Sequence, residues 1–259
     1  MLEKSMMTLL MASLICAVSS SPTSAQVSGK DNNEEGIHMQ VENRIFSRKV
    51  TINRTYEYVL LFPNDYHRTE DEWPLLLFLD SGSGRGTDIE RIRDYVIREV
   101  LGTFDELPFV VVAPQIPDDT AWCPHALNQL LEGLIAELRI DNDRVYVTGW
   151  SRGGYGTWEL AATYPDAFAA IMPISSREVH PTSRLKDIHT RICHGGKVKS
   201  IPVESAESML RSLEKKNADV ELIVYPEAGH GGAAAEAYSN SATWDWLLRQ
   251  QRRSSVLEK

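Results

Sequence analysis

The fold is decided by the stretch Arg144-Val145-Tyr146-Val147-Thr148-Gly149-Trp150-Ser151-Arg152-Gly153-Gly154. It starts as an apolar strand and runs at once into a helical segment. At the junction stands Gly149-x-Ser151-x-Gly153, which fits a tight strand-to-helix turn because only small neighbours let the backbones approach there. Such a turn projects the serine hydroxyl from the strand end in a strained conformation. Ser151 is therefore a candidate nucleophile, and the amide of Arg152, near a helix N-terminus, is a candidate donor to an oxyanion.

Strands and helices alternate on both sides of this turn. The runs Leu75–Leu79 and Phe109–Ala113 are continuously apolar, which is typical of strands buried on both faces. The stretch Asp141-Asn142-Asp143 is expected to break the chain before the next strand. Further strands are expected at Tyr56–Phe62, Val145–Val147, Ala169–Ile174, from Ile192 onward and at Glu221–Tyr225. Helices are expected at Ile89–Leu101, Ala126–Leu138, Gly153–Tyr164, Glu204–Lys216 and Ser241–Arg249. The alternation predicts a single α/β domain with a mostly parallel sheet and helices on both faces.

The composition is that of a globular protein with an acidic balance. Of 259 residues, 42% are hydrophobic and 24% are charged, which argues against a disordered or fibrous chain. The 36 Asp and Glu against 27 Lys and Arg give a net charge of -9, which argues against a nucleic-acid partner. The histidines show no paired metal-ligand spacing and the glycines no phosphate-binding loop, so neither a metal nor a cofactor is expected.

The first 25 residues predict a secretory signal peptide. Lys4 supplies a positive start, Met6 to Val18 is an apolar stretch too short to span a bilayer, and Ala25 is a small residue at the expected cleavage site. We therefore expect a secreted or periplasmic protein without a stable membrane anchor. Residues 26–43 are expected to form a flexible lead-in, 44–252 the folded domain and 253–259 a disordered tail.

Two cysteines remain after the predicted signal. Cys123 and Cys193 could pair in an exported protein, but the apolar surroundings of Cys193 favour a buried thiol. Trp122 and Trp150 are placed either in the core or at the mouth of a substrate pocket.

A serine hydroxyl is a weak nucleophile at neutral pH and needs a base. His230 follows the last predicted strand, in Gly229-His230-Gly231-Gly232, where a flexible loop can bring an imidazole over the turn at Ser151. His230 is therefore the candidate base.

With these motifs the sequence resembles the α/β-hydrolase superfamily, in particular the secreted esterases similar to polyhydroxybutyrate depolymerases, feruloyl esterases and predicted peptidases. The matching segments are Tyr58–Pro63, Trp73–Leu79, Gly149–Trp158, Tyr164–Asp166, His194-Gly195, Ile201–Glu204 and Gly229-His230. The resemblance implies an α/β-hydrolase fold and a Ser151 nucleophile with a His230 base working through an acyl-enzyme. The implied substrate is a small-molecule or polymeric ester.

Two family positions do not match. The family has a His-Gly pair after the strand Leu75–Leu79, where this chain has Asp80-Ser81. The amide of Ser81 can still be the second oxyanion donor, but the Asp80 carboxylate opposes a developing anion if it points there. The family's acid follows His-Gly in the pattern His-Gly-x-x-Asp, and here Val198 takes its place. Glu178, after a neighbouring strand, is the tentative replacement.

Two functions remain open from the sequence. One is a serine hydrolase acting on carboxylic esters, with a peptidase or amidase as its variant. The other is a catalytically impaired hydrolase-fold binding module, which the replacement of the acid by Val198 favours.

Overall fold

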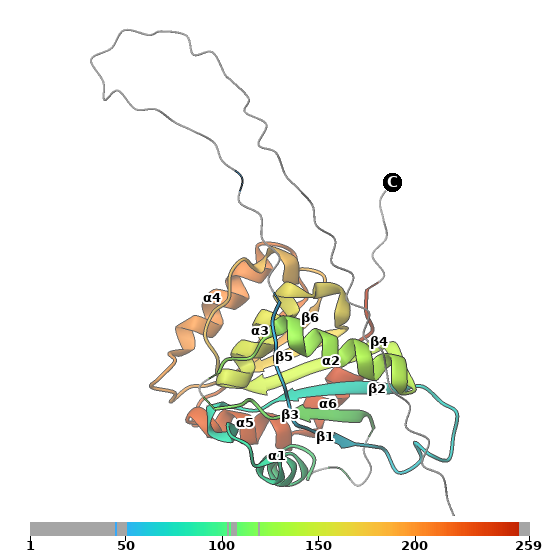
Figure 1. Ribbon diagram of the computed structural model, residues 1–259. Helices are drawn as coiled ribbons and strands as arrows, with labels where there is room; N and C mark the ends of the chain where they lie inside the picture. Colours follow the sequence, from blue (N-terminus) through green and yellow to red (C-terminus); the bar gives the residue numbers. More distant parts are fainter. Residues whose placement is uncertain (1–44, 46–50, 103, 105–107, 119, 254–259) are drawn as a thin grey trace, which may run out of the picture. The chain divides into compact units, whose positions relative to one another are not determined.

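The computed structural model describes residues 45, 51–102, 104, 108–118 and 120–253 (Figure 1). The chain divides into two units, residues 1–49 and 50–259, and only Ile45 of the first unit is described. The predicted signal peptide, the predicted lead-in and all of the predicted tail except Arg253 lie outside the described residues.

Within the described residues, seven strands form one sheet in the order β1-β3-β2-β4-β5-β6-β7. β1 lies antiparallel to β3 at one edge, and every other neighbouring pair is parallel. The strands are β1 (Tyr58–Leu61), β2 (Trp73–Leu79), β3 (Val110–Pro114), β4 (Ile140–Trp150), β5 (Ala170–Ile174), β6 (His189–Gly195) and β7 (Val220–Tyr225). The predicted α/β fold with a mostly parallel sheet is confirmed.

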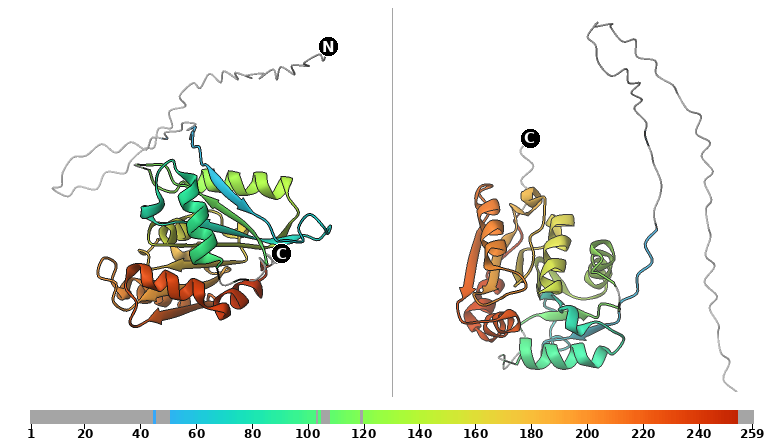
Figure 2. Two further views of the ribbon diagram at one scale, coloured as in Figure 1. Left: turned by 90° about the horizontal axis from the view of Figure 1, so that it is seen from below. Right: turned by 90° about the vertical axis from the view of Figure 1, so that its left-hand side faces the viewer.

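Helices cover both faces of the sheet, and Figures 1 and 2 show one group on each side. Alternate residues of β2 point to opposite faces, so Leu75, Leu77 and Leu79 join one buried cluster while Leu76 and Phe78 join the other. The first cluster packs under α2 (Pro124–Glu137), α3 (Arg152–Thr163) and α4 (Val203–Glu214). The second packs under α1 (Ile89–Tyr95), α5 (His230–Ser239) and α6 (Ser241–Leu248). None of the helices described has the length and hydrophobicity that crossing a membrane requires.

Three elements differ from the prediction. The stretch at Asp141 does not break the chain, because β4 runs through it with an irregularity in its pairing to β2, and the Asp141 side chain accepts from the amide of Asp143. The helix from Ile89 is α-helical only to Tyr95 and continues as a π-helical turn, Val96–Val100.

The third difference is α5, which the sequence analysis did not predict. Its first turn contains Gly231 and Gly232, and glycine is a poor helix former. Burial of Ala233, Ala234 and Ala237 against the sheet supplies the packing that local propensity lacks.

The cysteines stay unpaired. Cys123 and Cys193 are both free thiols. Cys193 is fully buried, and burial raises its pKa to about 12, so the expectation of a buried thiol is confirmed.

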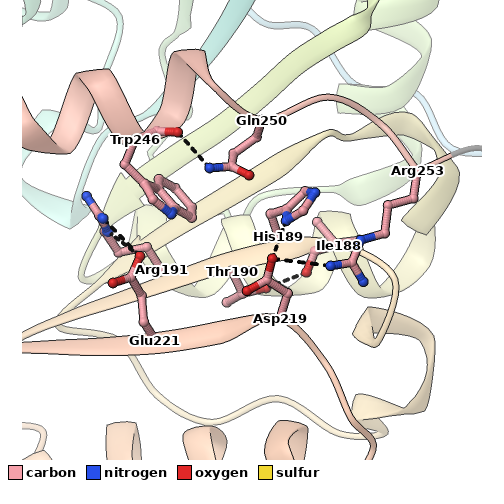
Figure 3. A network of polar contacts seen from close by, with 9 residues as sticks. All are labelled: Ile188, His189, Thr190, Arg191, Asp219, Glu221, Trp246, Gln250 and Arg253. Atoms are coloured by element: carbon pink, nitrogen blue, oxygen red, sulfur yellow. Dashed lines mark hydrogen bonds and ion pairs between the residues drawn. The ribbon is translucent and has the colours of Figure 1, made fainter.

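Charged side chains tie β6 to β7 at the end of the sheet where these strands begin (Figure 3). The imidazole Nδ1 of His189 lies 2.6 Å from the Asp219 carboxylate, which also accepts from Arg253. Arg191 pairs with Glu221 and stacks on the Trp246 ring, 4.4 Å from its centroid. This aspartate–histidine contact lies at the amino end of the parallel strands, opposite the carboxyl end where ligands bind in such sheets.

Candidate active site

Ser151 occupies a strained turn between β4 and α3. β4 ends at Trp150 and α3 begins at Arg152, so Ser151 alone makes the connection, with φ 55° and ψ -115°. A Cβ on Gly149 would lie 2.4 Å from the carbonyl oxygen of Leu79, and a Cβ on Gly153 would lie 1.8 Å from it. Glycine is therefore required on both sides of the serine, as the sequence predicted, because β2 passes directly against the turn.

His230 meets the serine across the carboxyl edge of the sheet. Its Nε2 lies 2.8 Å from the Oγ of Ser151. The expected flexible loop is only residues 226–229, and His230 is the first residue of α5. The Trp150 ring packs edge-on against the imidazole with centroids 5.5 Å apart, so Trp150 borders the site. Trp122 is instead a core residue, 4% exposed.

The electrostatic setting favours a neutral imidazole. Burial lowers the pKa of His230 below its usual range, and the nearby His194 lowers it further. At neutral pH the Nε2 of His230 is therefore able to accept the proton of the Ser151 hydroxyl.

Comparison with known proteins agrees with this geometry. Residues 123–250 match the model of the Dienelactone hydrolase family. A protein of Salmonella typhimurium strain LT2, named "Putative carboxymethylenebutenolidase", is 28% identical over 181 residues, covering 52% of this chain and 65% of that protein. Poly(3-hydroxyalkanoate) depolymerase C of Paucimonas lemoignei is 46% identical over 50 residues, 19% of this chain and 12% of the depolymerase. The crystal structure of a thermostable esterase superposes with a TM-score of 0.67 at 28% identity, over 75% of this chain and 59% of that one.

The chain belongs to the α/β-hydrolase superfamily. It spans less than two thirds of the length of the Salmonella relative and of the esterase. The depolymerase match agrees with the resemblance drawn from the motifs.

The two predicted oxyanion donors of this α/β-hydrolase differ in availability. Arg152 opens α3, so its amide is among those at a helix N-terminus that have no intrahelical carbonyl partner. The amide of Ser81 instead donates to the side chain of Asp80, 2.6 Å from Oδ1. Ser81 as predicted is therefore not a free donor in this structure.

Asp80 is buried, 4% exposed, and burial raises the pKa of its carboxyl group. A Cβ on Gly84 would lie 1.7 Å from its Oδ2, so the glycine of the following turn makes room for the carboxylate. The Asp80 carboxylate therefore lies inside the oxyanion loop, between the Ser81 amide and the α-carbon of Gly84.

The replacement acid was wrongly predicted. The carboxylate of Glu178 lies 3.3 Å from the Nε2 of His180, on the exposed loop after β5. The Nδ1 of His230, which an acid would contact, is buried and has no hydrogen-bond partner among the described residues. Val198, at the family's acid position, is 7% exposed. Its Cγ2 would lie 3.0 Å from a Cβ on Gly195, and the Gly229 carbonyl oxygen would lie 2.9 Å from the same Cβ.

The sequence analysis gave no role to two polar side chains at this edge, Ser175 and His194. Ser175 follows β5 with a positive φ of 43°, and His194 lies near the end of β6. Both are buried. No sequence pattern predicts a positive φ at a serine, so Ser175 could not be identified in advance. His194 entered the sequence analysis only as part of the His-Gly pair.

Proposed function

We propose that the protein is an exported serine hydrolase that acts on carboxylic esters. Ser151 Oγ attacks the ester carbonyl carbon while His230 Nε2 takes the hydroxyl proton. The Arg152 amide donates to the oxyanion, and His230 returns the proton to the departing alcohol. Water then hydrolyses the acyl-enzyme by the same steps in reverse order. The observation that carries the proposal is the 2.8 Å contact of His230 with a serine held at φ 55°.

The substrate class rests on the comparisons and on the site. The solved structure of similar fold is that of an esterase, the matching segment of the other relative belongs to a poly(3-hydroxyalkanoate) depolymerase, and the motif pattern agrees with both. A small-molecule or polymeric ester is therefore the proposed substrate. Export is proposed from the leader sequence at residues 1–25.

A second candidate function is a catalytically impaired binding module with this fold. Two observations favour it, the partnerless Nδ1 of His230 and the Ser81 amide that is bonded to Asp80. An imidazole that no acid orients is a weaker base, and one missing oxyanion donor lowers kcat by about 100- to 1000-fold in a serine protease.

Labelling with a fluorophosphonate probe separates the two candidates. The wild type and the matched control Ser239→Ala, an exposed serine on α5, are expected to be labelled and Ser151→Ala is not. Hydrolysis of short-chain p-nitrophenyl esters should follow the same order. A folded wild type that is neither labelled nor active would refute the proposed hydrolase and support the binding module.

A further inference from the structure

Several residues at the carboxyl edge of the sheet carry buried polar atoms that have no hydrogen-bond partner among the described residues. Besides the Nε1 of Trp150, these are the Nδ1 of His230, the Oγ of Ser175 and the Nδ1 of His194. Buried polar groups are nearly always paired, so three such atoms at one edge require an explanation. None of them is used by the reaction steps given above.

The sheet register brings Ser175 and His194 into one row with Ser151. Trp150 of β4 pairs with Ile174 of β5, and Ile174 pairs with Cys193 of β6. Ser151, Ser175 and His194 are the next residues along these three neighbouring strands, which lie about 4.8 Å apart.

Backbone bonds continue the pairing into this row. The Ser151 amide donates to Ile174 at 2.8 Å, and the Ser175 amide donates to Cys193 at 2.9 Å. His194 also lies near enough to His230 for its charge to lower the pKa of His230.

The donors and acceptors of the row are complementary. His194 Nε2 lies 3.0 Å from the Ile201 carbonyl oxygen, which only accepts, so Nε2 carries the proton and Nδ1 is an acceptor. His230 Nε2 accepts from Ser151, so in the neutral imidazole Nδ1 carries the proton and is a donor. The Ser175 hydroxyl can serve as both donor and acceptor, and its residue lies between Ser151 and His194 in the row.

We propose that Ser175 and His194 are the positioning residues that replace the missing acid. His230 Nδ1–H donates to Ser175 Oγ, and the Ser175 hydroxyl donates to His194 Nδ1, in each case through a buried water. His194 Nε2–H ends the chain on the Ile201 carbonyl oxygen. This hydrogen-bond relay holds His230 in the tautomer that accepts from Ser151 without a carboxylate at Nδ1. The inference rests on the proposed function, because it concerns the base of that reaction.

The backbone of Ser175 supports a selected position. Non-glycine residues with positive φ are uncommon, and in the described part of the chain they are Ser151, Ser175 and Asn217. Asn217 lies in an exposed turn after α4, whereas the other two lie side by side at the site. Strained residues persist where the surrounding structure uses them, as it does at Ser151.

Replacing Ser175 by glycine separates positioning from folding. Ser175→Gly relieves the positive φ while it removes the hydroxyl, so we expect an unchanged or higher Tm together with a kcat about tenfold lower and an unchanged KM. The matched control Asn217→Gly relieves the same kind of strain and is expected to leave kcat unchanged. An unchanged kcat in Ser175→Gly would overturn the inference.

A double-mutant cycle of Ser175→Gly with Val198→Asp measures the coupling between the two positions, which a purely structural role of Ser175 would not produce. In Val198→Asp the new carboxylate holds the Nδ1 proton, so adding Ser175→Gly should lower kcat much less than it does in the wild type. An equal loss in both backgrounds would contradict the relay.

Proton NMR tests the same hydrogen bond without turnover. A downfield Nδ1–H resonance that His230→Gln abolishes should shift in Ser175→Gly and in His194→Gln but not in Asn217→Gly. A resonance that neither site variant moves would also overturn the relay. Loss of labelling and of all turnover in the wild type would refute the hydrolase, and the NMR result would still decide on the relay.

Discussion

Val198→Asp tests how much the missing carboxylate limits this site. Val198 occupies the position of the family's acid, and its Cγ2 and the carbonyl oxygen of Gly229 both lie against the α-carbon of Gly195. An aspartate there has its carboxylate beside the residue that precedes His230. The buried Nδ1–H of His230 would then gain a charged acceptor.

The expected gain follows from the strength of that bond. A hydrogen bond to a charged group contributes about 1.5–3 kcal/mol net, which corresponds to roughly 10- to 150-fold in rate. Desolvation of a carboxylate at a position that is 7% exposed offsets part of this, so we expect kcat to rise about 10- to 50-fold. Loss of the buried valine side chain costs about 1.5 kcal/mol, so Tm should fall.

The assay is the pH dependence of p-nitrophenyl ester hydrolysis. The carboxylate favours the imidazolium of His230, so the acid limb of kcat/KM should move to higher pH while the plateau rises. Val198→Asn has the same shape without the charge and should give a smaller gain and no shift of the limb. A folded Val198→Asp with the wild-type rate and the wild-type acid limb would refute the reasoning.

Three further predictions concern the base, the oxyanion loop and the turn. Burial holds the pKa of His230 below about 6.5 and only the neutral form accepts a proton, so kcat/KM of the wild type should fall on the acid side with a midpoint below that pH; a midpoint above it contradicts the assigned environment. Asp80→Asn should raise Tm at pH 8, because a carboxyl whose pKa is raised on folding destabilises the protein once it ionises, and the gain should vanish toward about pH 4 in thermal melts. The same variant should raise kcat about tenfold by removing a charge that opposes the oxyanion, and a lower kcat would argue that Asp80 assists the reaction. Gly153→Ala places a Cβ 1.8 Å from the Leu79 carbonyl oxygen and should destabilise the fold by more than about 3 kcal/mol, whereas Gly133→Ala, with nothing within 4 Å, should stabilise α2 by about 0.5–1 kcal/mol, as measured by denaturant unfolding.

The relation between the Ser81 amide and Asp80 bears on regulation of the rate by pH. The carboxylate holds the second oxyanion donor at 2.6 Å, so a substrate oxyanion has to compete with it for the amide. Burial favours the neutral carboxylic acid, which is a weaker acceptor and carries no repelling charge. The ratio of kcat between Asp80→Asn and the wild type would therefore show how strongly the Asp80 carboxylate competes with the oxyanion for the Ser81 amide.

Local patterns in the sequence were enough to predict the sheet and the tight turn at Ser151. Continuous apolar runs such as Leu75–Leu79 can be recognised because a strand buried on both faces is apolar at every position. The glycines around Ser151 predict the turn because a close backbone approach excludes every residue with a side chain. The meeting of His230 with Ser151 followed from topology, since the carboxyl ends of parallel strands share one edge.

Other features depended on contacts between segments far apart in the chain. The helix at His230–Ser239 is stabilised by packing of its alanines on the sheet, which outweighs two unfavourable glycines. The extension of β4 through Asp141 likewise depends on pairing with β2 and on side-chain bonds that composition does not reveal.

By itself the sequence determined the α/β fold, the tight turn at Ser151 and the absence of a carboxylate at position 198. Only the tertiary structure decided which atoms touch. In the structure, Glu178 contacts His180 and not His230, and the Asp80 carboxylate accepts from the Ser81 amide. The strand register places Ser175 and His194 in one row with Ser151. The reason is that a periodic pattern reports which residues are buried, whereas the partner of a buried polar atom is set by strand register and backbone angles. Both are fixed by packing between distant segments of the chain.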